Sequence, residues 1–114
     1  MVCMDIRIIK NPITRAEAKE IAKEFYVEMV KWVVDIEKGV LALGGEWHID
    51  SNNVLTEDGS KQSNVWGFNF YPDENRIQYT SLINIRPAQN NRAIEIQNEE
   101  LRKKMEGVIK KLII

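Results

Sequence analysis

Residues 30–43 have the sequence VKWVVDIEKGVLAL, and this stretch predicts the β-hairpin on which the fold class depends. Every second position is apolar, as expected for a half-buried strand rich in β-branched residues. These positions are Val30, Trp32, Val34 and Ile36, and they alternate with Lys31, Val33, Asp35 and Glu37. The sequence EKG at 37–39 is typical of a tight turn, because glycine adopts positive φ without strain. Residues 40–43 are then the returning strand.

Three further strands are predicted, one before this hairpin and two after it. Ile6 to Ile9 form a short first strand that ends at the Asn-Pro pair 11–12. The aromatic residues Trp66, Phe68 and Phe70 alternate with smaller or polar ones, which predicts a strand with its aromatic side chains on one face. A turn at 72–75 leads into the returning arm, which we expect to run from Arg76 to Ile85.

Helices are predicted before, between and after the hairpins. Thr14 and Glu17 have the spacing of a capping box and begin the first helix. Asp50 or Ser51 caps a short helix that Gly59 ends in the left-handed conformation. Asn98 caps the last helix. The apolar face of the first helix consists of Ala18, Ile21, Ala22, Phe25 and Met29, and that of the last helix consists of Leu101, Met105, Val108 and Leu112.

This order of elements predicts an α+β fold. We expect a single domain over residues 1–114, with one antiparallel sheet of about five strands and two main helices packed on one face. The length of 114 residues suits one compact core without disulfides or a structural metal.

Composition excludes several functional classes. The chain has 44% hydrophobic and 29% charged residues, as in ordinary globular proteins, and its net charge is −1. Bulk nucleic-acid binding is therefore not expected, because it normally needs an excess of Lys and Arg. One cysteine, no signal-peptide pattern and no apolar run long enough to cross a bilayer favour a cytoplasmic protein without membrane contact.

The first candidate site is the stretch GGEWHID at 44–50. If the strand continues through it, Glu46, His48 and Asp50 lie on one face. Glu46 as general base and His48 as general acid would then suit a metal-independent phosphoester hydrolase of the ribonuclease kind. The alternative is a structural histidine that is hydrogen-bonded to a neighbouring carboxylate. A metal site is not expected, because the chain has one histidine, and no cofactor is expected.

The second candidate site combines arginine, lysine and amide side chains. Arginine offers a bidentate fork for phosphate or carboxylate, and amides add neutral donors. In the alternative interpretation, Arg86 pairs with a carboxylate across the sheet and the amides bond to loop backbone. The predicted binding site for a small anionic ligand consists of Lys61, Gln62, Asn84, Arg86, Asn91 and Arg92.

A third hypothesis is a protein–protein interaction module. An exposed sheet edge or the last helix would meet a partner or a second copy of the chain, so that a homo-oligomer is possible.

Several short motifs occur in a fixed order along the chain. They are VVDIEKG at 33–39, GGE at 44–46 followed by His48, GSKQ at 59–62, WG at 66–67, YP at 71–72, INIRP at 83–87 and NR at 91–92. Together these motifs resemble a family of small prokaryotic proteins defined by a domain of unknown function. The similarity extends from about Ile6 to Leu112 and implies a stand-alone cytoplasmic domain of about this length. It implies no activity, so no catalytic residue is carried over.

Overall fold

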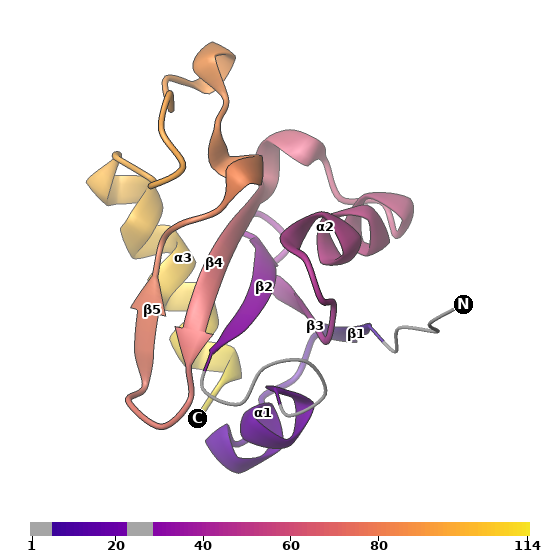
Figure 1. Cartoon of the computed structure of the whole chain (residues 1–114). Helices are drawn as coiled ribbons and strands as arrows, with labels where there is room; N and C mark the ends of the chain where they lie inside the picture. Colours follow the sequence, from indigo (N-terminus) through magenta and orange to yellow (C-terminus); the bar gives the residue numbers. More distant parts are fainter. Residues whose placement is uncertain (1–5, 23–28) are drawn as a thin grey trace.

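A computed structural model describes residues 6–22 and 29–114, and shows five strands and three α-helices within this part of the chain (Figure 1). Three short 3-10 turns, η1 to η3, lie in the connections. The elements are β1 (Arg7–Ile9), α1 (Arg15–Ala22), β2 (Val30–Asp35), β3 (Val40–Leu43), α2 (His48–Glu57), η1 (Gln62–Asn64), β4 (Val65–Tyr71), β5 (Arg76–Gln78), η2 (Leu82–Asn84), η3 (Pro87–Gln89) and α3 (Glu99–Leu112).

The strands form one sheet in the order β1-β3-β2-β4-β5, and every neighbouring pair is antiparallel. Strand β2 lies at the centre, where Trp32 pairs with Phe68 and Val33 pairs with Gly67 of β4. The predicted α+β class with one five-stranded antiparallel sheet is confirmed.

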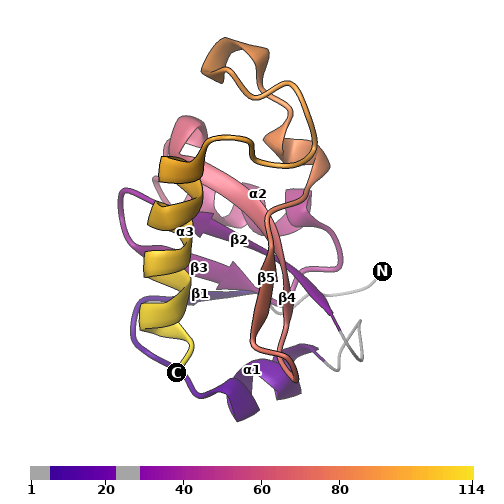
Figure 2. The ribbon, with the colours of Figure 1, turned by 90° about the vertical axis from the view of Figure 1, so that its left-hand side faces the viewer.

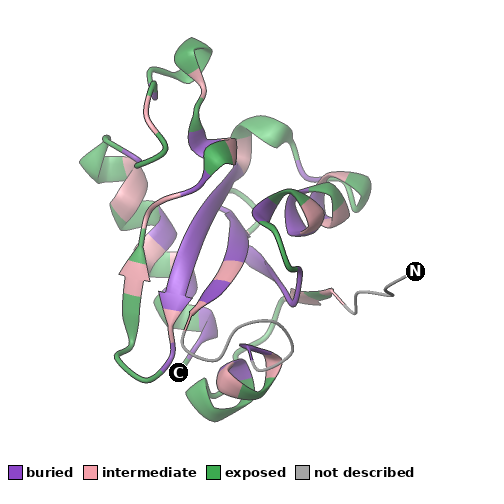
Figure 3. Ribbon diagram, viewed as in Figure 1, coloured by how far each residue is buried: buried purple, intermediate pink, exposed green. Residues whose placement is uncertain are grey.

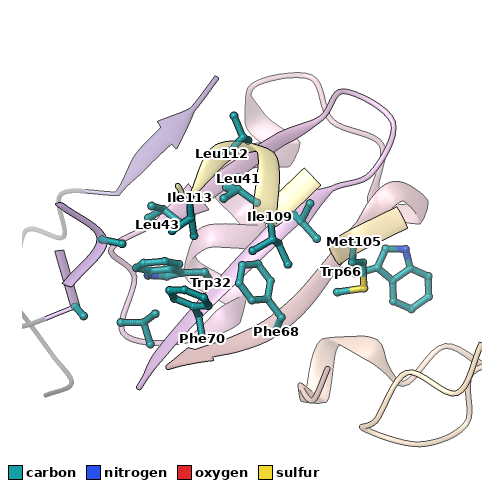
Figure 4. Close-up of a cluster of buried hydrophobic side chains, with 14 of the residues drawn as sticks. Trp32, Leu41, Leu43, Trp66, Phe68, Phe70, Met105, Ile109, Leu112 and Ile113 are labelled. Carbon is teal, nitrogen blue, oxygen red and sulfur yellow. The ribbon is translucent and has the colours of Figure 1, made fainter. Parts of the chain in front are cut away.

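The α3 face of the sheet carries the larger core. In Figure 2, α3 lies in front of the strands and α2 lies behind them. The alternation predicted from the sequence is present here, because Trp32, Phe68 and Phe70 all point to this side (Figure 4). The ring of Trp32 stacks on Phe70 with centroids 5.7 Å apart, and meets Phe68 edge-on at 6.5 Å. Helix α3 covers these rings with Met105, Ile109 and Leu112.

A smaller core lies on the opposite face. It is formed by Val33, Ala42 and Val65 of the sheet together with Leu55 of α2. Helices therefore lie on both faces, and the predicted arrangement of two main helices on one face is not confirmed. Helix α1 lies at one end of the sheet, close to the C-terminus (Figures 1 and 2), and its Ala18 and Ala22 belong to the α3-side core.

The caps predicted from the sequence are present at two of the three α-helices described, α1 and α3. The amide of Glu17 donates to the Thr14 hydroxyl at 3.1 Å, and the amide of Leu101 donates to Asn98 at 3.0 Å. At α2 the predicted cap is wrong: the helix begins at His48, and the carboxylate of Asp50 accepts from the amide of Trp47 at 3.3 Å. Gly59 has the expected positive φ, +99°.

The predicted helix from Thr14 to Met29 falls partly outside the described residues. Helix α1 is described to Ala22, and residues 23–28, which include Phe25, are not described. Met29 lies outside any helix and directly precedes β2.

The predicted strand from Arg76 to Ile85 is wrong beyond Gln78. Strand β5 ends there, and Thr80 instead forms an isolated bridge with Glu95. The hydroxyl of Ser81 then accepts from the amide of Ile83 and caps η2. The segment between β5 and α3 projects above the sheet in Figures 1 and 2 and is mostly exposed in Figure 3. Within the described residues, no helix is long and apolar enough to cross a membrane.

Candidate functional site

A pocket of about 400 Å³ opens on the α2 side of the sheet. It lies between the first turn of α2 and the segment that follows β5, and its other walls come from β2 and β4. Sites for small molecules or for side chains of a partner commonly have this size and position. The lining residues are Lys31, Trp47, His48, Ile49, Asn69, Thr80, Ser81, Leu82, Ile83 and Ile94.

Exposed apolar side chains surround this pocket. Leu82 has 77% of its surface exposed and Trp47 has 52%, and Ile49 and Ile94 are also exposed. Ile85, which is exposed too, follows η2 directly. Contiguous exposed apolar surface with a concave centre is typical of an interaction site. Lys31 also lines the pocket, and its ammonium lies 4.6 Å from the centre of the Trp47 ring.

The backbone around His48 depends on glycines. Gly44 has a φ of +105°, a conformation that favours glycine. A Cβ on Gly45 would lie 2.7 Å from the Ser51 hydroxyl, so glycine allows the turn from β3 to pack closely against α2. A Cβ on Gly67 would lie 2.6 Å from Ser81 Cβ and 3.1 Å from His48 Cδ2. The glycine in β4 therefore allows the histidine and η2 to approach the strand.

His48 is a buried, neutral histidine. Its Nε2 lies 2.9 Å from the carbonyl oxygen of Phe68, and since a carbonyl only accepts, Nε2 carries the proton. The pKa of His48 is lowered from 6.5 to about 4, mainly because burial removes water from the charged ring. The charge of Lys31 also lowers this pKa, whereas the hydrogen bond to Phe68 opposes the change.

This shift predicts a specific loss of stability in mild acid. The unfolded chain binds a proton at His48 near pH 6.5 and the folded chain near pH 4, so the free energy of unfolding falls as the pH is lowered through that window. We expect a loss of about 2 kcal/mol between pH 7 and pH 5, measured by urea unfolding. In the His48→Gln variant this dependence should largely disappear, because the chain has one histidine and carboxylates titrate mainly below pH 5. A wild-type stability that stays level from pH 7 to pH 5 would contradict the burial of a neutral ring.

The predicted acid–base pair gains no support from this geometry. His48 is the first residue of α2, whereas Glu46 is exposed in the preceding connection, so the two do not share a strand face as expected. The ring is uncharged at neutral pH, and its Nε2 proton is donated to Phe68. The catalytic roles of Glu46 and His48 remain predictions.

Arg86, the centre of the predicted anion site, is hydrogen-bonded to backbone. Its Nε donates to the carbonyl of Ile83 at 3.0 Å, Nη1 donates to that of Gln62 at 2.8 Å, and Nη2 donates to that of Val65. The guanidinium also lies 4.1 Å from the centre of the Trp66 ring. Burial lowers the pKa of Arg86 from its ordinary value. Its donors thus join η2, η1 and β4.

The amide side chains of the predicted site, of which Asn84 and Asn91 are buried, have similar structural contacts. The Asn84 side chain accepts from the amide of Gly67 at 2.8 Å and donates to the same residue's carbonyl at 2.9 Å. It therefore replaces a strand at this part of the β4 edge. The Asn91 amide donates to the carbonyls of Asn84 and Ala93, at 2.7 and 2.9 Å. Gln62 exchanges two hydrogen bonds with Asn52 of α2, at 2.6 and 2.8 Å.

The structure thus brings four of the six predicted ligand residues into contacts that hold the loop in place. Lys61 and Arg92 are exposed at the surface. The sequence interpretation in which amides satisfy loop backbone describes Asn84 and Asn91, whereas Arg86 bonds to carbonyl groups rather than to a carboxylate. Anion binding by these residues remains a prediction.

Sequence reasoning missed the apolar rim of the pocket. Leu82, Ile85 and Ile94 occur in a segment otherwise rich in Asn, Arg and Gln, and this isolated apolar character was the available signal. Among the described residues, no group of three or more His, Cys, Asp and Glu side chains converges to hold a metal ion.

The fold and the pocket define a small α+β domain with an apolar surface site. The chain matches the family described as a protein of unknown function (DUF5674) over residues 7–112, and it belongs to this family. No curated protein and no solved structure matches the chain.

Proposed function

We propose that this protein is a self-associating module in which the apolar pocket receives side chains from a second copy of the chain. The observation that carries this proposal is the ring of exposed apolar residues, Leu82, Trp47, Ile49 and Ile94, around a concave centre. Burial of such side chains is the main favourable contribution to protein association.

A protein surface fits this site better than a small molecule does. Leu82 is 77% exposed although it lines the pocket, and the exposed Ile85 lies beyond the lining residues. A small ligand seated in the pocket would leave Ile85, which does not line it, in water. A partner protein covers the cavity and its rim together.

A second copy of the chain supplies both parts of such a contact, a projecting side chain and a cavity that receives it. A two-fold symmetric interface uses the same patch on each subunit, so it needs a projection and a cavity side by side. The patch has both, since Leu82 projects beside a cavity of about 400 Å³. Lys31 is the charged residue among the lining residues, so an isologous contact must leave it at the wet rim.

The experiment is sedimentation equilibrium over a range of chain concentrations. We expect the wild-type chain to form a dimer with a Kd in the micromolar range. For the Leu82→Asp variant we expect this Kd to rise by about tenfold or more. Because Leu82 is exposed, its replacement should leave the circular dichroism spectrum unchanged. Ile114→Asp is the matched control: this side chain is 66% exposed and lies outside the patch.

Two results would overturn the proposal. One is a wild-type chain that stays monomeric to millimolar concentration. The other is a dimer that Leu82→Asp and Ile114→Asp weaken equally.

The small-anion hypothesis has less support at its predicted residues. The polar atoms of Arg86, Asn84 and Asn91 are hydrogen-bonded to backbone of the loop, of η1 and of β4, so an anion there would have to displace those contacts. A different set of cationic side chains is better placed for an anion.

A further inference from the structure

A second concave surface lies on the other side of the molecule from the apolar pocket, and its residues are mostly basic. It is a groove of about 570 Å³ between residues 103–112 of α3, the β2–β3 turn and the end of β1. Five lysines line it, together with one acidic residue, Glu37. The lysines are Lys10, Lys38, Lys103, Lys104 and Lys111.

One of these lysines is held by backbone, since Lys38 Nζ donates to the carbonyl oxygen of Asp58 at 3.2 Å. Within residues 6–22 and 29–114, no ion pair joins any of the five to a carboxylate. Other lysines behave differently: Lys19 pairs with Asp73, and Lys110 of α3 pairs with Glu106, both at 2.6 Å. Because the whole chain has a net charge of −1, the positive charge of the groove is a local feature.

Hydrogen bonds fix the turn on one side of the groove, and two glycines border its open space. The carboxylate of Asp35 accepts from the amides of Glu37 and Lys38, both at 2.9 Å, which fixes the turn that carries Lys38. Gly107 lies on α3 between Lys103 and Lys111, one helical turn from each. A Cβ at Gly107 or Gly39 would meet nothing within 4 Å, so both positions border open space.

We propose that this groove binds a compact polyphosphate, that is, a chain of two or more phosphates, either free or attached to a small molecule. The four remaining ammonium groups, those of Lys10, Lys103, Lys104 and Lys111, need a ligand of high charge density, and a single carboxylate would balance one of them. None of the residues lining the groove is aromatic, so recognition there is by charge rather than by base stacking.

A long nucleic acid fits this surface less well than a compact anion does. A polymer would extend beyond the groove onto the rest of the molecule, which carries a net negative charge when the groove is set aside. Like charges repel at such distances in low salt. A compact ligand contacts the lysines alone.

The test is calorimetric titration of the full chain with inorganic tripolyphosphate at low salt, with amide and lysine side-chain NMR to locate the site. We expect binding that weakens as salt is added, with the largest shifts at the groove lysines. The double variant Lys103→Gln/Lys111→Gln should lose about tenfold or more in affinity. Lys110→Gln is the matched control, since Lys110 lies on the same helix and is paired with Glu106.

A steric variant tests the groove without changing its charge. Gly107→Leu places a side chain in the open space and removes a poor helix former, so the fold is kept while binding of tripolyphosphate falls. Titrations with a nucleoside triphosphate and with orthophosphate distinguish an attached from a free phosphate chain and from a single phosphate.

Three results would overturn this inference. The first is the absence of shifts at the groove lysines with millimolar tripolyphosphate at low salt. The second is an equal loss of affinity in Lys110→Gln and in the double variant. The third is a single-stranded oligonucleotide that binds the same residues more tightly than tripolyphosphate does. None of these results depends on the oligomeric state of the chain.

Discussion

Replacement of Trp32 by alanine is expected to lower the free energy of unfolding by about 3–5 kcal/mol, the largest effect that we predict for a single substitution. Trp32 is 1% exposed and lies at the centre of the sheet, on β2. The variant loses the stacked contact with Phe70 and the edge contact with Phe68, and it leaves a cavity under α3. Small domains are stable by only about 5–15 kcal/mol, so the variant should be close to unfolding at 37 °C.

Trp47→Ala is the matched control for this measurement. The same residue type is replaced, but Trp47 is half exposed at the pocket rim, so we expect a change below about 1 kcal/mol. Urea unfolding of dilute protein, followed by circular dichroism, measures both variants without a contribution from association. Equal losses in the two variants would show that Trp32 is not the centre of the core.

Arg86→Ala is the second substitution with a large expected effect, a loss of about 3–4 kcal/mol in the free energy of unfolding. The guanidinium donates to the carbonyls of Ile83, Gln62 and Val65, and it lies over the Trp66 ring. Hydrogen bonds from a charged donor contribute more than neutral ones, and a buried carbonyl that loses its donor is costly. We therefore expect η2 to detach from β4 and η3 from η1, with increased amide exchange at residues 82–91.

Arg92→Ala is the control for Arg86→Ala and separates the two interpretations of this loop. Arg92 belongs to the same segment but is exposed, so its replacement should change the stability by about 0.5 kcal/mol or less. If Arg86 instead served mainly to bind an anion, Arg86→Ala would leave the stability almost unchanged and would weaken phosphate binding. Urea unfolding with and without phosphate decides between these results.

Much of the fold could be predicted because the large side chains of the main core occupy alternating positions of β2 and β4. The patterns at 30–36 and 66–70 predicted correctly which side chains of β2 and β4 share the α3 side of the sheet, since a period of two reflects local backbone geometry. The caps at Thr14 and Asn98 could be predicted for the same reason, because a cap involves residues three apart in the chain.

The chain after Gln78 shows where local patterns were insufficient. Residues 76–85 alternate like a strand, but the edge of β4 is satisfied there by the side chain of Asn84. An amide that replaces a strand depends on the position of Gly67, seventeen residues earlier in the chain. No periodicity within the segment contains that information.

The candidate sites were predicted from residue type, and residue type did not decide their roles. Arginine, asparagine and glutamine can hold an anion or satisfy backbone groups equally well, and the neighbours available in space decide which occurs. Both concave surfaces were missed for a related reason. The five groove lysines come from three elements that are far apart in the sequence, and the pocket joins β2, β4, α2 and the segment after β5.

The sequence by itself determined the α+β class, the strand faces and two helix caps, because each of these depends on residues within a few positions of one another. The tertiary structure alone decided three features: that α2 covers the face opposite α3, that His48 is buried and neutral, and that five lysines share one groove. Burial and charge density depend on all the atoms that surround a group in space. Most of those atoms belong to residues far away in the chain, so local sequence patterns do not specify them.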